Sequence, residues 1–443
     1  MALPPSNKAQ EYVQQVCAQI RWKKAHPVVE EELLAHIEDQ REAFLAEGMS
    51  AEEAEAQAVA EMGSPLETGS QFDRIYRPKM EWSIVLLVGV MLILGTVLRG
   101  RLLIAMGTGY AITDLWSIPI GLVFMMLGYW LDYTALLAGG NKRANRTAIL
   151  YFCIVLGIAY GLNSYYDSAR VERFLGYMAL FCPLLFCSGL YVRQKTGVYE
   201  YWGEYLAILL YVWLFGQANA RAALLILGSC TIILLFALWK NWFNCSRWWG
   251  LSVILSPLLL SAFILAKPYR ITRITAFLNP YADPMGEGYL PCKILDAVQS
   301  ASLFGAGGTT LLTLRENLPS VSTNYLLTAA LSWWGWFAII LILLAYVVLL
   351  AACYFACRKV KSTFGQMVVV AITSTWMIQI LLYVITNFTA MQIGTYPLLF
   401  VQGNVAIVCN LFLLGLLLSV YKTGAVVKDE IAVQPKERTK INS

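Results

Sequence analysis

The chain has 443 residues, of which 58% are hydrophobic and 14% are charged. Soluble domains carry roughly 25% charged residues, so this composition excludes a soluble globular enzyme. Charge is also unevenly placed: residues 1–80 hold eight Lys and Arg against fourteen Asp and Glu, net −6, and the remainder carries +11. Both histidines, His26 and His36, lie in the acidic stretch, so the apolar remainder has no imidazole for a metal site or a catalytic triad. Two regions with different surroundings are predicted.

Residues 1–80 are predicted to form a small helical bundle on the cytoplasmic side. The expected helices lie at 6–24, at 28–47, between a Ser50–Glu53 capping box and Gly63, and from Ser64 and Pro65 onward. Two runs, 31–39 and 58–65, make this region similar to the prefix domain found ahead of permease-like membrane proteins in Gram-positive bacteria. That resemblance implies a docking or regulatory module without catalysis.

The rest of the chain, residues 81–422, is predicted to be an all-α polytopic membrane domain, followed by a cytoplasmic tail at 423–443. A bilayer core of about 30 Å needs roughly 20 apolar residues per helix, and suitable charge-poor stretches recur ten times. The predicted spans are 82–98, 113–131, 147–165, 173–192, 202–219, 222–239, 248–266, 323–351, 363–386 and 397–420.

Lys and Arg cluster in alternate loops, as the positive-inside rule requires. The clusters are Arg74, Arg77 and Lys79; Lys142, Arg143 and Arg146; Arg193 and Lys195; Lys240 and Arg247; and Arg358, Lys359 and Lys361. The pattern predicts a plasma-membrane protein with both termini in the cytoplasm and one long extracellular loop, residues 267–322.

The extracellular loop carries a dense series of motif residues. They are Arg270, Arg273, Phe277, Asn279, Pro280, Asp283, Pro284, Gly286, Gly288, Tyr289, Gln299 and Ser300. Their order resembles the SEDS family of shape, elongation, division and sporulation proteins, which includes the RodA and FtsW types. Members have ten transmembrane helices, cytoplasmic ends and a long outer loop between helices seven and eight, which agrees with the span count and orientation derived above.

The resemblance implies a peptidoglycan glycosyltransferase that polymerises lipid II. The 4-hydroxyl of the sugar on one lipid-linked precursor attacks the anomeric carbon of another, and undecaprenyl pyrophosphate leaves. Such a step needs a base for the hydroxyl and cations for the developing diphosphate charge. Asp283 is the expected base, and Arg270 and Arg273, three residues apart, are expected to face the pyrophosphate. The other expected substrate-binding residues are Tyr289, Gln299, Ser300, Gln379 and Asn387.

Each of these residues also has a structural interpretation. Asp-Pro followed by Gly is a common turn signal, and arginines at a membrane surface often extend their charged ends toward water. Gln299 and Ser300 could shape the loop rather than bind. Gln379 and Asn387 could line a groove for the lipid or join helices by hydrogen bonds.

No cluster of residues in the sequence requires a metal, and the ten scattered cysteines mostly lie in apolar runs. A divalent cation such as Mg²⁺ or Mn²⁺ could still neutralise the diphosphate. The resemblance implies lipid II and a class B penicillin-binding protein as partners, and no nucleic acid.

Several departures from the family pattern leave other functions open. About six extra residues separate Tyr289 from Gln299, the Asp expected at the start of the eighth helix is Asn324, and an expected acidic pair is Ser332 and Trp333. These changes would fit a scaffold for division or cell shape that has lost catalysis. A transporter of lipid-linked precursors is the other alternative, which charged residues in the last spans would favour. The motifs do not separate division, elongation and sporulation.

Overall fold

The structure, a computed structural model, is helical. It describes residues 7–78, 80–107, 116–131, 133, 168–192, 202–203, 205–206, 208–212, 215, 219–241, 248, 275–319, 321–392, 396, 399–401 and 404–424, and every regular element in them is a helix. The chain divides into two compact units. The first comprises Met1–Met80 with Lys359–Gly365 and Tyr421–Ser443, and the second comprises Glu81–Arg358 and Gln366–Val420.

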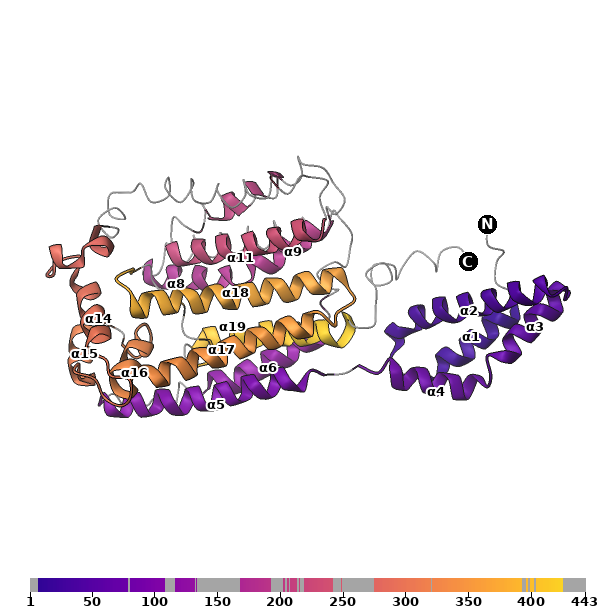
Figure 1. Ribbon diagram of the computed structural model, residues 1–443, viewed down its shortest axis with the longest axis horizontal. Helices are drawn as coiled ribbons and strands as arrows, with labels where there is room; N and C mark the ends of the chain where they lie inside the picture. The colour runs from indigo at the N-terminus through magenta and orange to yellow at the C-terminus, as the bar shows by residue number, and fades with distance from the viewer. Residues whose placement is uncertain are drawn as a thin grey trace. The chain divides into compact units, whose positions relative to one another are not determined.

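The N-terminal part of the first unit is a four-helix bundle (Figure 1). Its elements are α1 (Asn7–Gln19), the 3₁₀ turn η1 (Lys23–Ala25), α2 (His26–Ala46), α3 (Ala51–Glu61) and α4 (Pro65–Ile75). The predicted capping residue Ser50 accepts a hydrogen bond from the backbone of Glu53 at 3.4 Å. The first helix is shorter than predicted, because η1 takes up the last residues of the expected range 6–24.

Two tight contacts hold this bundle together. A Cβ on Gly69 would lie 2.8 Å from the carbonyl oxygen of Val16, so only glycine lets α4 approach α1 this closely. The hydroxyl of Tyr76 donates to Glu32 at 2.6 Å. Burial, together with this hydrogen bond, raises the pKa of Tyr76 to about 12, so the phenol stays protonated and keeps its bond at physiological pH.

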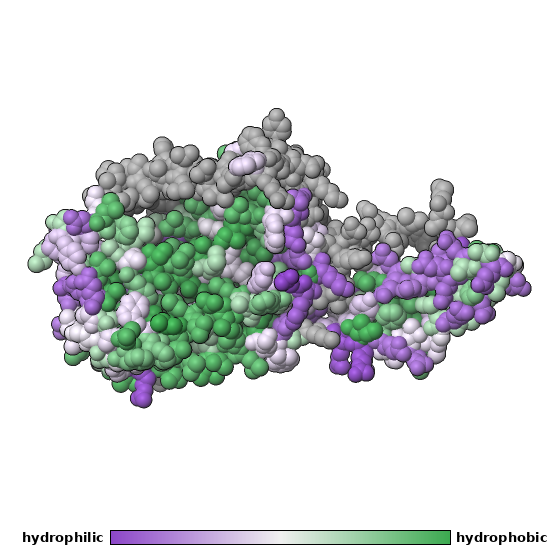
Figure 2. Space-filling view, viewed as in Figure 1, coloured by the Kyte–Doolittle hydropathy of each residue, from purple (hydrophilic) through white to green (hydrophobic). Residues whose placement is uncertain are grey.

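The second unit contains the apolar helices, the last two of which each extend by a few residues into the first unit. They are α5 (Trp82–Ala105), α6 (Ser117–Trp130), α8 (Ser168–Ala179), α9 (Cys182–Val192), α11 (Ala220–Trp239), α16 (Leu326–Trp334), α17 (Trp336–Cys357), α18 (Thr363–Phe388) and α19 (Asn404–Gly424). Six stretches in the described residues are long and apolar enough to cross a bilayer. Figure 2 shows the broad apolar face that these helices present. The prediction of an all-α, multi-pass membrane protein is therefore confirmed.

Some predicted spans differ from the helices found. The span expected at 113–131 contains α6, and its residues before 116 are not described. The span expected at 173–192 is found as the apolar stretch Arg173–Tyr191, with a break between α8 and α9. Pro183 explains that break, because it has no N–H for the carbonyl of Ala179. The spans predicted at 147–165, 248–266 and, in part, 202–219 lie outside the described residues.

The prediction of one continuous span over 323–351 is wrong, because the helix breaks at Gly335. Gly335 has φ +78°, and a Cβ there would lie 2.7 Å from the carbonyl oxygen of Ser302. The loop at 302–307 hydrogen-bonds both sides of the break. Trp336 and Phe337 donate to the carbonyls of Ser302 and Leu303, and Gly305 and Gly307 donate to the carbonyls of Trp334 and Ser332, all at 2.9–3.2 Å. The result is a short buried helix, α16, ahead of the membrane-spanning α17.

Glycines also set the distance between α6 and α19. A Cβ on Gly128 would lie 2.6 Å from the carbonyl oxygen of Phe412, and one on Gly415 would meet the carbonyl of Met125. Such backbone contact is typical of helix packing in membranes. Elsewhere α11 packs on α8 and α9, and α17 packs on α5 and α16.

Candidate functional site

Asp283 lies in a tight turn that joins η4 (Pro280–Ala282) to α14 (Tyr289–Gln299). Its carbonyl oxygen accepts from the backbone N–H groups of Gly286 and Gly288 at 3.3 and 3.1 Å. Its side-chain Oδ1 accepts from the N–H of Gly286 at 3.0 Å. Among the described residues Oδ2 has no hydrogen-bond partner, and the side chain is exposed. The backbone thus holds an accessible carboxylate in one orientation.

The two glycines of the Gly-x-Gly motif are required by this turn. A Cβ on Gly286 would clash with the carboxylate of Asp283, and a Cβ on Gly288 would clash with the carbonyl of Pro280 and lie 2.6 Å from that of Asp283. The motif therefore has a direct physical reason: only glycine leaves room for the Asp283 carboxylate and for the carbonyls beneath it.

Tyr289, the first residue of α14, braces the turn from the loop side. Its hydroxyl donates to Oδ1 of Asn317 at 2.9 Å, and Asn317 ends the short helix α15 (Leu311–Asn317). Asn317 donates in turn to the carbonyl of Thr313 at 2.7 Å. Tyr289 thus ties α14 to α15 beside the Asp283 turn.

Gln299 and Ser300 lie at the opposite end of α14 and are exposed. Ten residues separate Tyr289 from Gln299, which at 1.5 Å per residue is about 15 Å. Ser300 caps the helix end, where its hydroxyl pairs with that of Thr309 at 2.7 Å and its carbonyl accepts from Gly308 at 2.9 Å. The structure does not bring this pair to Asp283.

Asn387 lies in the interior of the second unit, where it joins α18 to α16. Its Oδ1 accepts from the backbone N–H and the hydroxyl of Thr328, each at 3.1 Å. Its Nδ2 donates to the carbonyls of Asn324 and Tyr383 at 3.0 and 2.9 Å. The side chain is fully buried, so its hydrogen-bonding capacity is taken up by the protein.

Gln379 joins α18 to α19 in a similar way. Its Nε2 donates to Oδ1 of Asn410 at 3.2 Å, and the same oxygen accepts from the indole of Trp376 at 3.1 Å. All three side chains are buried. Arg270 and Arg273 lie outside the described residues, which resume at 275.

The residues that depart from the family pattern are also placed. Asn324 is exposed and lies just before α16, while Ser332 is buried and donates to the carbonyl of Thr328 at 3.1 Å. The ring of Trp333 stacks on Trp334 with centroids 5.4 Å apart.

A small pocket of about 210 Å³ with polar and apolar lining residues lies beside the Asp283 turn. It is lined by Ala276, Glu287, Leu290, Pro291, Tyr325, Ala390 and Gln392. The Tyr325 hydroxyl donates to the amide oxygen of Gln392 at 2.7 Å, and Glu287 comes from the turn itself. This pocket was not predicted, because Tyr325 and Gln392 are 67 residues apart and no pattern in the neighbouring sequence indicates that they pair.

This pocket is smaller than the roughly 300–1,000 Å³ of typical ligand sites and would hold about one sugar ring. Its carboxylate, amide and phenol can bond hydroxyl groups, and Leu290 and Pro291 offer an apolar surface. Within the described residues, no three His, Cys, Asp or Glu side chains gather as a metal site would require.

The sequence matches the family of cell cycle proteins that comprises FtsW, RodA and SpoVE over residues 192–425, more than half of the chain. Stage V sporulation protein E of Bacillus subtilis is 32% identical over 173 residues, which cover 38% of this chain and 47% of that protein. A protein of Trichlorobacter lovleyi named probable peptidoglycan glycosyltransferase FtsW is 24% identical over 339 residues, 72% of this chain and 79% of that one. The chain spans less than half the length of two of the curated relatives it matches.

Two solved structures share the fold. One, described as "Structural coordination of polymerization and crosslinking by a peptidoglycan synthase complex", superposes with a TM-score of 0.55 and 17% identity over 77% of this chain and 97% of that chain. The rod shape determining protein RodA of Thermus thermophilus superposes with a TM-score of 0.51 and 14% identity, over 78% and 97%. The chain therefore belongs to the FtsW/RodA/SpoVE family of cell cycle proteins.

Proposed function

We propose that this protein is a peptidoglycan glycosyltransferase that polymerises lipid II, with Asp283 as the general base. The observation that carries the proposal is the Asp283 turn: an exposed carboxylate, fixed by the N–H of Gly286 at 3.0 Å, beside a pocket the size of one sugar ring. The family relationship supports the same reaction, because several relatives are named probable peptidoglycan glycosyltransferases.

In the proposed reaction, Asp283 takes the proton of the attacking sugar hydroxyl as that oxygen bonds to the anomeric carbon of a second precursor. The bond from this carbon to the polyprenyl diphosphate breaks, and the diphosphate leaves with the electron pair. Positioned proton transfer of this kind contributes about 10²–10⁴-fold to a rate. Arg270 and Arg273 are the proposed partners of the diphosphate, because guanidinium groups bind phosphate oxygens in pairs.

The reaction sets the orientation that we propose. Lipid II is used on the outer face of the plasma membrane, so the Asp283 turn would lie outside and both termini in the cytoplasm, as the Lys and Arg pattern also predicts. A class B penicillin-binding protein is the proposed partner. The likeness in fold to a chain of a peptidoglycan synthase complex is consistent with that pairing.

Polymerisation of purified lipid II by the purified protein, with its class B partner present, tests the proposal. Asp283→Asn keeps the size of the side chain and removes the base, so glycan chains should fall at least about 100-fold. Asp296→Asn is the matched control: Asp296 is an exposed carboxylate on α14 that accepts from the Tyr281 hydroxyl at 3.3 Å, outside the Asp283 turn. It should polymerise like the wild type.

If wild type and both variants are folded and none makes glycan, the scaffold or transporter alternatives replace the enzyme. If Asp283→Asn is as active as Asp296→Asn, the protein is a polymerase with a different base.

A further inference from the structure

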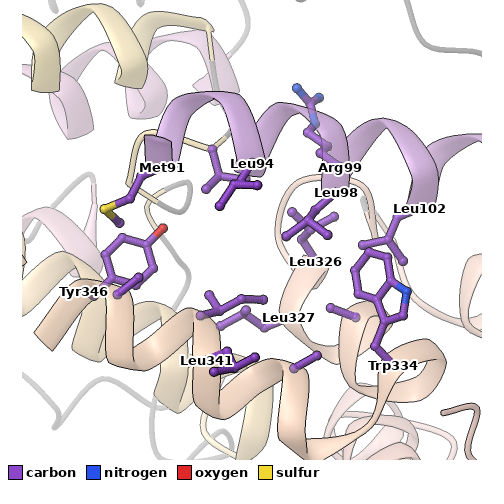
Figure 3. Close-up of a pocket in the computed structure, with 16 residues that line it drawn as sticks. Met91, Leu94, Leu98, Arg99, Leu102, Leu326, Leu327, Trp334, Leu341 and Tyr346 are labelled. Carbon is purple, nitrogen blue, oxygen red and sulfur yellow. The ribbon is translucent and has the colours of Figure 1, made fainter. Parts of the chain in front are cut away.

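A long apolar groove lies between α5, α16 and α17 (Figure 3). Its volume is about 450 Å³, and the lining includes Met91, Leu94 and Leu102 from α5, Leu327 from α16, and Leu341 and Tyr346 from α17. Leu102, Leu327 and Tyr346 are 1–2% exposed, whereas Leu94 and Leu341 are 55% and 51% exposed. The floor is therefore buried and the rim faces the surface that a bilayer would cover.

The dimensions of the groove suit a single hydrocarbon chain. Met91 and Leu102 are eleven residues apart on α5, which is about 16 Å at 1.5 Å per residue. Spread over that length, 450 Å³ gives a mean cross-section of about 28 Å², and carbon atoms in contact lie about 4 Å apart. The groove is thus wide enough for a hydrocarbon chain.

Small residues keep the groove open. Ala338 and Ala345 line it from α17, and Gly95 lines it from α5. A Cβ on Gly95 would lie 2.7 Å from the side chain of Val401, so even alanine is crowded at that point.

The polar groups around the groove do not call for a polar ligand. The Tyr346 hydroxyl donates to the carbonyl of Leu399 at 2.7 Å. Arg99 also lines the groove and is 7% exposed, and its guanidinium points away from the labelled leucines in Figure 3. The surface of the groove that a ligand would contact is therefore apolar.

The short helix α16 separates this groove from the pocket beside Asp283. Tyr325, the residue before α16, lines the pocket beside Asp283, and Leu326 and Leu327 line the groove. The two sites are therefore one or two residues apart along the chain. A molecule with a sugar head and a single long apolar chain could fill both.

We propose that the groove between α5, α16 and α17 holds the polyprenyl chain of the lipid-linked substrate while its sugar occupies the pocket beside Asp283. This inference rests on the proposed function, because it assigns a place to the chain of that substrate. The break at Gly335 separates α16, which lies between the proposed sites of head and chain, from α17, which lines the groove.

Filling the groove tests the proposal. Ala338→Phe and Ala345→Phe each place a ring in the groove, whereas Ile340→Phe places one on α17 at a residue that is 58% exposed and does not line it. Polymerisation is measured with lipid II carrying its full polyprenyl chain and with an analogue carrying a geranyl chain. Both groove variants should raise KM for the full-length substrate about tenfold, the effect of losing burial of about two methylene groups. KM for the geranyl analogue should not change, and Ile340→Phe should leave both values as in the wild type.

Several results would overturn the proposal while leaving the proposed function intact. One is a wild type whose KM does not distinguish the two substrates, which would mean that the polyprenyl chain makes no contact that contributes to binding. Another is that both groove variants have the wild-type KM for both substrates, or that their KM rises equally for both. A wild type that polymerises neither substrate removes the proposed function, and this inference with it.

Discussion

Two polar regions of the second unit are built in opposite ways. In the Asp283 turn, the side chain is exposed and one of its carboxylate oxygens accepts from the N–H of Gly286. At Asn387, the side chain is fully buried, and its oxygen and nitrogen together make four hydrogen bonds, to Thr328 of α16, to Tyr383 of α18 and to Asn324 just before α16. Buried polar groups are normally saturated in this way, so spare capacity distinguishes a residue placed for a ligand from one placed for the fold.

The largest effect on activity predicted from this contrast is that of Gly288→Ala. The added Cβ would clash with the carbonyl of Pro280 and lie 2.6 Å from that of Asp283, so the turn must open and carry the carboxylate with it. A displacement of about 1 Å at a reacting group can reduce a rate about 100-fold. We expect a loss of this size in lipid II polymerisation, with little change in the thermal unfolding of the protein in detergent. Gly189→Ala, inside α9 with open space around it, is the control, and an active Gly288→Ala enzyme would contradict the role given to the turn.

The opposite outcome is expected for Asn387→Leu, which should act on stability first. The change leaves the buried N–H of Thr328 without its acceptor at 3.1 Å, and an unsatisfied buried donor costs about 1–3 kcal/mol. Thermal and denaturant unfolding should show this loss. Thr373→Val, which removes a hydroxyl bonded only within α18, should change stability far less. If Asn387→Leu kept full stability but raised KM, Asn387 would belong with the substrate-binding residues after all.

Gln379→Leu should have a smaller effect of the same kind. It removes the 3.2 Å bond to Oδ1 of Asn410 and the 3.4 Å bond that Nδ2 of Asn410 donates to Gln379. Asn410 keeps the bond from the Trp376 indole at 3.1 Å and its own bond to the carbonyl of Ala406 at 2.9 Å. Hydrogen bonds between membrane helices are worth about 0.6 kcal/mol on average and at most about 1.7. Unfolding of Gln379→Leu and Asn387→Leu side by side gives the ranking, and a larger loss at Gln379 would reverse it.

Helices that depend on the composition of one segment could be predicted from the sequence. Features that depend on tertiary contacts could not. Long apolar runs predicted α5, α11 and α18 because burial of such residues in lipid is a property of each segment alone. The break at Gly335 was missed, because residues 323–351 read as one apolar run and the groups that fix the break, the carbonyls of Ser302 and Leu303, are over thirty residues away.

The same distinction holds for the candidate site. The turn around Asp283 and its two glycines could be predicted, because it is built from neighbours in sequence; the role of Asp283 as a base stays a prediction. The pocket formed by Tyr325 and Gln392, and the groove between α5 and α17, depend on packing between helices that no local pattern records.

Tyr289 has two candidate roles, in holding the fold and in binding the substrate, and a double-mutant cycle distinguishes them. Its hydroxyl donates to Asn317 at 2.9 Å, which makes it a brace between α14 and α15, although the motif suggested contact with substrate. As a brace, Tyr289→Phe should reduce stability by about 0.5–1.5 kcal/mol and leave KM unchanged. Asn317→Leu removes the same bond from the other side, so the double variant should lose less than the sum of the two single losses. If Tyr289→Phe instead raises KM while Asn317→Leu does not, the Tyr289 hydroxyl exchanges its bond to Asn317 for a bond to the substrate.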